Sequence, residues 1–219
     1  MIIDERLSAY INTLAAPLPE PLRQIEKEAL ANHVPIIRKD MQSLLRFLLI
    51  ERKPKNILEI GTAVGFSALL MRECVDSGCK LTTIEKVPKR IDKAKDNFQK
   101  MGKQEDILLL EGDAADVLVQ LAENGEQYDF IFMDAAKGQY LSFLEYIYAL
   151  LAPHGMLVTD NVLQDGDVIQ SRYAITRRDR TIHGRMREYL YTLTHTDKLE
   201  TVVLPVGDGV TLSIRKEEE

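Results

Sequence analysis

The stretch that decides the fold runs from Asn56 to Leu70 and reads N-I-L-E-I-G-T-A-V-G-F-S-A-L-L. Its first part is a short apolar run that ends at Gly61, which is typical of a buried strand. Gly65 then opens a segment whose apolar side chains recur at helical spacing, so the two glycines predict a tight turn between a strand and a helix. The free N–H groups at such a helix start favour an anionic group. We therefore expect a ligand site at this turn.

The composition is that of a soluble globular protein. The 219 residues are 45% hydrophobic and 28% charged, with a net charge of −6 that argues against general coating of nucleic acid. The length suits one well-buried α/β domain. Cys74 and Cys79 have no Cys or His partners at ligand spacing and are interpreted as thiols in a reducing compartment. No signal pattern and no membrane-length apolar run is evident, so we expect a cytoplasmic protein without a membrane partner.

The first fifty residues have helical patterns and are interpreted as an N-terminal extension, residues 1–50, packed on a domain of residues 51–219. One face of the first pattern carries Leu7, Tyr10, Ile11 and Leu14. Further apolar faces follow around Leu22 and around Leu45, separated by the breaks at Pro17–Pro19 and Pro35. Because no flexible linker separates the two parts, we expect a single domain overall.

From Asn56 onward the chain alternates between strands and helices. Strands are predicted at 57–60, 81–85, 106–110, 128–133 and 155–159, with helices near 65–76, 88–101, 114–122 and 138–151. This alternation predicts an α/β protein with a Rossmann-like, doubly wound and mostly parallel sheet. Residues 200–206 and 210–214 flank a Gly-Asp-Gly turn, and they predict a C-terminal antiparallel hairpin that brings the sheet to seven strands.

Ligands of open parallel sheets bind beyond the carboxyl ends of the strands. The G-x-x-x-G spacing, with Ala63 in its middle, lacks the central glycine of a dinucleotide fingerprint, and no second three-strand half follows. S-adenosylmethionine is favoured instead, because it has one nucleoside and an amino-acid end but no pyrophosphate. Ser67 would bind the methionine carboxylate and Glu85 the ribose hydroxyls. The candidate cofactor-binding residues at these strand ends are Glu59, Gly61, Thr62, Ser67, Glu85, Asp113 and Ala114. Purely structural roles remain open for each.

A second group of polar residues follows the fourth and fifth predicted strands. Asp134, Asp160 and Asn161 would converge if these strands are neighbours. Such an all-oxygen set suits Mg²⁺ rather than Zn²⁺. The alternative is that Asp134 caps a helix and the other two form a turn. Lys137 stands near a predicted helix start, where a lysine opposes the helix dipole, and this favours a functional role.

Four motifs together resemble the metal-dependent O-methyltransferases of the catechol and caffeoyl-CoA type: Leu58-Glu59-Ile60-Gly61, Gly65-Phe66-Ser67, Asp134-Ala135-Ala136-Lys137 and Asp160-Asn161. The resemblance covers nearly the whole chain. It implies that Asp134, Asp160 and Asn161 bind Mg²⁺, that Lys137 acts as or beside the general base, and that Asp134 belongs to both the catalytic and the cofactor-binding set. It also implies that the loop near Ile36 covers the cofactor and that the chain forms a homodimer, for which the N-terminal helices are candidates. Ala136 departs from the acid that plant members often carry.

The segment after the metal candidates is rich in arginine. Six arginines stand against one acid, Asp179, namely Arg172, Arg177, Arg178, Arg180, Arg185 and Arg187. Arginine suits bidentate contacts to phosphate and stacking on bases, so these residues are predicted to bind RNA. A solvated helix face or ion pairs between subunits is the alternative. His183 is interpreted as a surface member of this patch.

The predicted metal site favours a substrate that chelates the metal, and the predicted arginine patch favours one that carries phosphates. Together they indicate an RNA substrate. The C5 hydroxyl and C4 carbonyl of 5-hydroxyuridine form a catechol-like pair, and an exposed anticodon-loop base can be splayed into a pocket. Within the family the chain most resembles the bacterial tRNA 5-hydroxyuridine methyltransferases, which make 5-methoxyuridine at the wobble position. We therefore predict this activity on tRNA. The alternatives are an O-methyltransferase of small catechol-like or hydroxycinnamoyl substrates, and a non-catalytic RNA-binding module.

Overall fold

The computed structural model describes residues 4–217. The chain divides into two compact units, which we call the first unit (residues 8–117) and the second unit (residues 118–219 together with 1–7). Each is described below by itself. No helix within residues 4–217 is long and apolar enough to cross a membrane. The predicted division into a 1–50 extension and a 51–219 domain stays a prediction.

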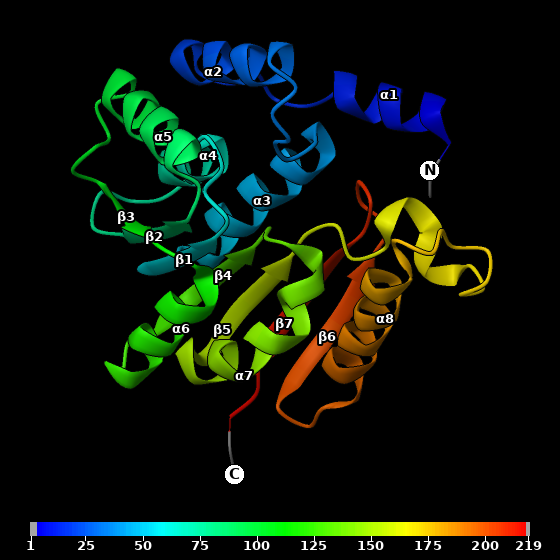
Figure 1. Cartoon of the computed structure of the whole chain (residues 1–219). Helices are drawn as coiled ribbons and strands as arrows, with labels where there is room; N and C mark the ends of the chain where they lie inside the picture. Colours follow the sequence, from blue (N-terminus) through cyan, green and yellow to red (C-terminus); the bar gives the residue numbers. More distant parts are fainter. Residues whose placement is uncertain (1–3, 218–219) are drawn as a thin grey trace. The chain divides into compact units, whose positions relative to one another are not determined.

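The first unit contains three parallel strands, in the order β3-β2-β1 (Figure 1). These are β1 (Asn56–Ile60), β2 (Lys80–Glu85) and β3 (Ile107–Glu111). Helix α4 (Phe66–Glu73) follows β1 directly and α5 (Pro88–Lys100) follows β2, as the alternating pattern predicts. The apolar side chains of β1 are fully buried, so the run that opens the motif is the centre of this core. Parallel pairing places the ends of all three strands at one edge.

Two helices of the predicted extension pack on α4 in the same unit. They are α2 (Glu20–Ala31) and α3 (Lys39–Arg52), and their apolar faces around Leu22 and Leu45 are buried as predicted. The Gln42 side chain ties them together, since its amide donates to the Glu26 carboxylate at 2.9 Å and to the Ile37 carbonyl at 3.0 Å. The loop between these helices, residues 32–38, is thereby fixed at both ends.

Helix α1 (Glu5–Thr13) differs from the expectation. Its predicted apolar face was expected to pack on the domain, but none of its residues is buried. Tyr10 and Ile11, for example, are 61% and 44% exposed in the single chain. The periodicity predicts the helix correctly and its packing wrongly, because an amphipathic pattern does not say which surface covers the apolar face.

The second unit contains four strands, in the order β4-β5-β7-β6. Strands β4 (Tyr128–Met133) and β5 (Leu151–Thr159) are parallel, whereas β7 (Val210–Arg215) runs antiparallel to both β5 and β6 (Leu199–Leu204). The predicted C-terminal hairpin is therefore confirmed. Helix α6 (Ala114–Glu123) leads into this unit, α7 (Tyr140–Leu150) joins β4 to β5, and α8 (Arg180–His195) packs beside β6 (Figure 1).

Two short 3₁₀ segments flank the ends of β4 and β5. The first, η1 (Lys137–Gln139), replaces the beginning of the helix predicted at 138–151, and the second, η2 (Gln164–Ile169), follows β5. A buried tyrosine pair supports this end of the unit, because the rings of Tyr140 and Tyr189 meet edge to face at 5.6 Å. The Tyr189 hydroxyl also forms a hydrogen bond of 2.7 Å with the hydroxyl of Thr159, which is the last residue of β5. The strand ends are thus held on a rigid core.

Candidate active site

The turn after β1 has the backbone shape that its glycines predict. Gly61 and Gly65 have positive φ angles of 109° and 81°, and Ala63 between them has 46°. A Cβ on Gly65 would also lie 2.5 Å from a ring carbon of Phe98, so both conformation and space require glycine there. The N–H groups of Gly61 and Thr62 donate to the Ile84 carbonyl, which anchors the turn on β2.

Glu59 is fully buried and belongs to a short polar chain inside the first unit. The Thr83 hydroxyl donates to its carboxylate, and the hydroxyls of Thr83 and Thr62 lie 2.6 Å apart in a further hydrogen bond. The Thr62 side chain therefore faces the core of its unit, and its amide is engaged by the Ile84 carbonyl. The predicted cofactor contacts of Glu59 and Thr62 stay predictions, since this structure gives both side chains a partner within the protein.

Glu85 at the end of β2 binds the turn itself. Its carboxylate accepts hydrogen bonds from the backbone N–H groups of Ala63 (2.9 Å), Lys86 (2.9 Å) and Val87 (3.0 Å), and the residue is 7% exposed. One carboxylate thus fixes the loop after β2 and the glycine turn after β1 in a single arrangement. A ribose bound to Glu85, as predicted, would meet an acceptor that the backbone already holds in place.

Asp113 plays a similar part after β3, where Ala114 begins α6. Its carboxylate accepts hydrogen bonds of 3.0 Å from the Ala115 N–H and the Lys86 ammonium. These two contacts hold the pKa of the Asp113 carboxyl below its ordinary value. Gly61, Glu85 and Asp113 therefore meet at the strand edge of the first unit, as predicted, and they form what we call the strand-edge cradle.

The remaining predicted cofactor residues of this unit lie near the cradle or on its approach. Ser67 is half-buried in the first turn of α4, and Ile36 is half-buried in the loop between α2 and α3. Beside Val64 the unit has a pocket of about 540 Å³, into which α2 contributes Ile25 and α5 contributes Asn97. The Asn97 amide donates to the Val64 carbonyl at 2.8 Å, which braces the turn from outside.

In the second unit the polar ends of β4 and β5 are neighbours, as the metal prediction requires. Met133 and Thr159 are paired residues of the two strands, so Asp134 and Asp160 follow at the same edge. The Asp160 N–H donates to the Met133 carbonyl at 3.0 Å, and the Asp160 carboxylate accepts the Asn161 N–H at 2.7 Å. Asp160 is 3% exposed. The structure thus brings these three residues together, but their binding of a metal stays a prediction.

Asp208 joins this group, and sequence reasoning missed it. Its carboxylate accepts a hydrogen bond of 2.5 Å from the Asn161 amide and lies 3.7 Å from the Lys137 ammonium. The hairpin turn is held there by backbone bonds of 2.9 Å from Leu163 to the Asp208 carbonyl and from Val162 to the Gly209 carbonyl. The Gly-Asp-Gly signal predicts the turn correctly. Nothing in it indicates that the turn reaches the end of β5.

We call Asp134, Lys137, Asp160, Asn161 and Asp208 the acidic cluster. Removal from solvent raises the pKa of the Asp134 carboxyl to about 6, the charge of Asp208 adds to this rise, and Lys137 opposes it. The Tyr140 hydroxyl donates to the Asp160 carbonyl at 3.2 Å. The Asp134 carboxyl is therefore influenced by two charges of opposite sign, that of Asp208 and that of Lys137, whose ammonium lies 3.7 Å from Asp208.

The donor chemistry of the acidic cluster fits a hard cation. Carboxylate and amide oxygens are available, and sulfur or imidazole ligands are not part of the set. Among residues 4–217 no three or more His, Cys, Asp or Glu side chains are arranged to hold a metal by themselves. The predicted set therefore depends on the amide of Asn161, whose nitrogen is used by Asp208 and whose oxygen is the atom that would face a cation.

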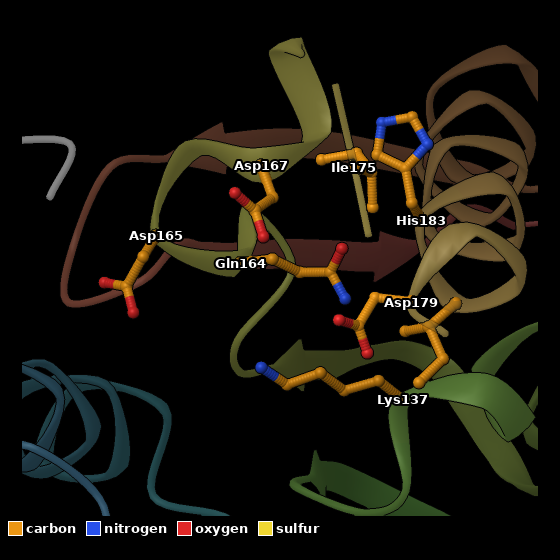
Figure 2. A pocket seen from close by; sticks show the side chains of 8 residues that line it. Lys137, Gln164, Asp165, Asp167, Ile175, Asp179 and His183 are labelled. Carbon is orange, nitrogen blue, oxygen red and sulfur yellow. The ribbon is translucent and has the colours of Figure 1, made fainter. Parts of the chain in front are cut away.

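A pocket of about 320 Å³ opens beside Lys137 (Figure 2). Residues of η2 and α8 form its other walls, and it is lined by Lys137, Gln164, Asp165, Asp167, Ile175, Asp179, Ile182 and His183. The Lys137 side chain, one-third exposed, lies along one edge of it. His183 corrects an expectation, because it is 4% exposed rather than a surface residue, and its Nε2 atom has no hydrogen-bond partner within the described part of the chain.

The six arginines divide into two groups. Three of them donate to backbone carbonyls, Arg180 to Ile175 at 3.1 Å, Arg185 to Gly138 at 2.8 Å and Arg187 to Val168 at 2.9 Å. These bonds fasten α8 to the neighbouring loops, a role that the charge pattern alone does not predict. Arg172, Arg177 and Arg178 are exposed on the segment before α8, and none has a hydrogen bond or ion pair to any described residue. RNA binding by all six stays a prediction.

A glycine turn after β1, acids after β2 and β3, and a terminal antiparallel hairpin define the methyltransferase class of α/β folds. The family model described as O-methyltransferase matches residues 8–216, and the chain belongs to this family. A catechol O-methyltransferase of Niastella koreensis is 32% identical over 167 residues, which is 74% of each chain. Caffeoyl-CoA O-methyltransferase 1 of Eucalyptus globulus is 31% identical over 203 residues, covering 90% of this chain and 82% of the relative.

Solved structures support the same assignment. The O-methyltransferase from Bacillus cereus, crystallised with SAH, matches with a TM-score of 0.84 and 25% identity, over 96% of this chain and 97% of that one. The predicted fold class, a Rossmann-like α/β methyltransferase with a mostly parallel sheet and antiparallel C-terminal strands, is confirmed by this match and by the strand pairings within each unit.

Proposed function

We propose that the protein is an S-adenosylmethionine-dependent O-methyltransferase whose substrate is 5-hydroxyuridine in the anticodon loop of tRNA. The family match and the SAH complex of the Bacillus cereus relative support the cofactor and the reaction type. In the strand-edge cradle, Glu85 is preorganised to accept hydrogen bonds from ribose hydroxyls. The sulfonium is cationic, so an anionic oxygen nucleophile is attracted to it and the charge is neutralised during methyl transfer.

We propose further that the reaction requires Mg²⁺ held by Asp134, Asp160 and Asn161. The donor chemistry supports this, because the oxygen-bearing side chains of Asp134 and Asp160 follow paired residues of neighbouring strands, and burial and the charge of Asp208 raise the pKa of the Asp134 carboxyl to about 6. A bound Mg²⁺ lowers the pKa of a coordinated hydroxyl and orients a substrate with two neighbouring oxygens. Lys137 borders the pocket and, in its neutral amine form, would take the proton from the substrate hydroxyl. Asp208 holds Lys137 and Asn161 in position from the hairpin turn.

The choice of RNA is supported above all by one observation, the three exposed arginines without protein partners on the segment that borders the pocket. Arginines of this kind are available for phosphate groups. The competing proposal is a small catechol or hydroxycinnamoyl substrate, which the names of the similar proteins favour. A non-catalytic RNA-binding module is disfavoured, because RNA binding alone needs neither the cluster nor Lys137.

Labelled S-adenosylmethionine tests the proposal directly. The protein is incubated with hydroxyuridine-containing tRNA or with a catechol panel, each with Mg²⁺ and with EDTA. We expect label in tRNA and its loss in EDTA. Label that appears in catechols alone would refute the tRNA substrate while leaving the methyltransferase assignment intact.

A homodimer through the N-terminal helices is also proposed. The exposed apolar face of α1 with Leu7, Tyr10 and Ile11, continued by Leu14 just after the helix, supports this, because such a face loses unfavourable contact with water when it is covered. Light scattering on the purified protein tests it.

A further inference from the structure

Two apolar side chains stand out on the surface of the second unit. Tyr173 is 87% exposed and Ile169 is 82% exposed, and they are the most exposed large hydrophobic residues among those that the structure describes. Ile169 is the last residue of η2, and Tyr173 belongs to the segment that connects η2 to α8. An aromatic ring held almost entirely in water is available for contact with a flat partner.

The backbone beneath Tyr173 is fixed. The Tyr173 N–H donates to the Ser171 hydroxyl at 3.3 Å, and the Ala174 N–H donates to the Ser171 carbonyl at 2.8 Å. Ile175, two residues on, is 7% exposed and anchors the turn, and its carbonyl accepts the Arg180 side chain at 3.1 Å. Because the support is already ordered, stacking on the Tyr173 ring would cost little conformational entropy.

Arginine predominates in the segment around the ring, whose one acid, Asp179, accepts a hydrogen bond from the Thr176 hydroxyl. Arg172 precedes the ring in the chain, and Arg177 and Arg178 follow within the same segment; all three are exposed and unengaged by other described residues. A partner that complements this surface must offer both flat rings and regularly spaced negative charges. Single-stranded nucleic acid has this chemistry, since its bases stack on aromatic side chains while its phosphates bind arginine.

The position of the segment relative to the pocket connects these features to catalysis. Ile175 and Asp179 line the pocket together with Lys137, so Tyr173, two residues before Ile175, belongs to the chain segment that forms one wall of the pocket. A small catechol would fit inside the pocket without reaching a ring that is 87% exposed. A nucleotide chain would extend beyond it.

We propose that Tyr173 is a stacking platform for a nucleobase adjacent to the methylated one, with Arg172 holding a neighbouring phosphate. This inference rests on the proposed RNA substrate and adds how the protein distinguishes a base within an RNA loop from the free nucleoside. Tyr173 is a positioning residue, because it contacts the RNA outside the reacting base.

The test measures binding of an anticodon stem-loop RNA that contains 5-hydroxyuridine, together with methylation of the free 5-hydroxyuridine nucleoside. We expect Tyr173→Ala to weaken RNA binding about tenfold, within the roughly 5- to 150-fold range of lost base stacking, and Tyr173→Phe to bind within about twofold of the wild type. Tyr173→Ala should leave the salt dependence of binding unchanged, whereas Arg172→Gln should reduce its slope by about one. Methylation of the nucleoside should be equal in all three variants.

Tyr191 provides a matched control. It is also exposed and on α8, about 13 Å along the helix from the pocket residue Ile182, and its ring stacks on His195. Tyr191→Ala should bind RNA like the wild type. Equal RNA affinity of Tyr173→Ala and wild type would overturn the platform alone, and so would a Tyr173→Leu variant with full affinity. Failure of the wild type to bind the stem-loop would instead refute the RNA substrate. Light scattering on each variant measures its oligomeric state. If Tyr173→Ala loses RNA affinity and also changes its oligomeric state, Tyr173 belongs to a contact between copies of the chain, and the proposal is overturned.

Discussion

The strand ends of the two units carry the same kind of group, a carboxylate, in two different electrostatic settings. In the strand-edge cradle, Glu85 accepts three backbone N–H groups and Asp113 accepts one N–H and one ammonium group. In the acidic cluster, burial and the charge of Asp208 raise the pKa of the Asp134 carboxyl to about 6, and the Lys137 ammonium lies 3.7 Å from Asp208. Hydrogen bonds thus stabilise the charged form of Asp113, whereas burial and a like charge disfavour the charged form of Asp134.

This difference leads us to expect that the strand-edge cradle binds the cofactor and that the acidic cluster takes part in the reaction. Acceptors that are already fixed by backbone donors can present a rigid edge to a neutral ribose without reorganisation. A carboxyl whose pKa is raised by burial and by a neighbouring carboxylate, as for Asp134, is more common at sites that bind a cation or transfer a proton. We therefore expect substitutions in the cradle to affect cofactor affinity and substitutions in the cluster to affect turnover.

The largest effect is expected for Asp134→Asn, which keeps the shape of the side chain and removes its charge. We expect kcat to fall roughly a thousandfold, as when several kcal/mol of charge stabilisation is lost, with Mg²⁺ unable to restore it. Affinity for S-adenosylhomocysteine should change far less. The matched control is Asp197→Asn, an exposed aspartate between α8 and β6 of the same unit, which should be fully active. A variant with normal kcat would remove Asp134 from the reaction.

A smaller loss of turnover is expected for Lys137→Met. Removing a general base costs about 10²- to 10⁴-fold, and we expect the lower part of this range because hydroxide can replace the base as pH rises. The pH–rate profile of the variant should therefore climb with pH where that of the wild type levels off. Lys137→Arg distinguishes charge from base function. Arginine keeps a positive charge next to Asp208 but stays protonated, so it cannot accept the substrate proton. Full activity of the arginine variant would mean that Lys137 acts through its charge.

Glu85→Gln should act on binding. We expect the Kd for S-adenosylhomocysteine to rise about 10- to 100-fold, since a hydrogen bond to a charged acceptor is worth about 1.5–3 kcal/mol, while kcat at saturating cofactor stays within a few-fold. Isothermal titration calorimetry measures this Kd. Glu111→Gln is the matched control, because Glu111 pairs with Glu85 in the β2–β3 register but is exposed and bound to Lys95. Equal affinities of both variants and wild type would contradict the cradle.

The smallest effect on the fold is expected outside both regions, on α1. Tyr10→Ser removes an exposed side chain, so the free energy of unfolding of the isolated chain should change by less than about 0.5 kcal/mol. If α1 forms the proposed dimer interface, the dimer dissociation constant should nevertheless rise. Analytical ultracentrifugation at several concentrations measures this, and a variant with unchanged association would exclude Tyr10 from the interface.

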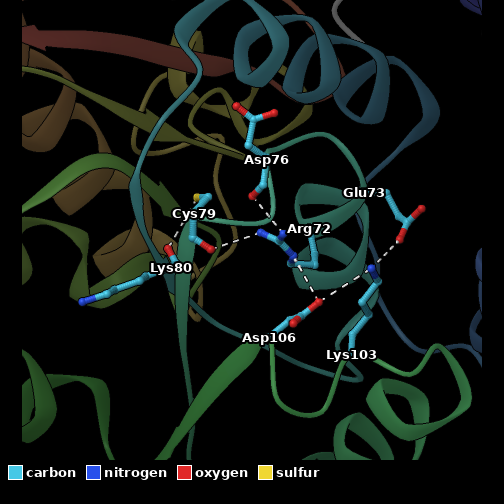
Figure 3. Close-up of polar contacts among 7 residues, drawn as sticks. All are labelled: Arg72, Glu73, Asp76, Cys79, Lys80, Lys103 and Asp106. Atoms are coloured by element: carbon cyan, nitrogen blue, oxygen red, sulfur yellow. Dashed lines mark hydrogen bonds and ion pairs between the residues drawn. The ribbon is translucent and has the colours of Figure 1, made fainter.

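Some contacts at the opposite edge of the same strands, where β2 and β3 begin, could not be predicted from sequence. Arg72 is 5% exposed, and its guanidinium donates to the carbonyls of Cys79 at 3.1 Å and Asp76 at 2.8 Å and lies 3.5 Å from the Asp106 carboxylate (Figure 3). Lys103 adds contacts to Glu73 and Asp106 in the same network. A helical pattern predicts where Arg72 lies on α4. Backbone carbonyls have no sequence signature, so these partners emerge only when the loops fold around it.

The candidate site likewise contains residues that local sequence patterns predict and contacts that only the folded chain shows. Local patterns predict Gly61, Glu85, Asp134 and Asp160 at strand ends, because a strand followed by a turn is recognisable over a few residues. They do not predict Asp208, since its approach to Asn161 depends on how the hairpin returns to β5. The burial of His183 and the carbonyl contacts of Arg180 and Arg187 were missed for the same reason.

The sequence by itself determines the order of strands and helices, the glycine turn and the family, because each depends on residue spacing within one segment. The tertiary structure decides which carboxylates influence one another, which arginines are already engaged and which aromatic ring remains exposed on the segment that lines the pocket. Those properties depend on distances between segments far apart in the chain, and such distances are set by packing.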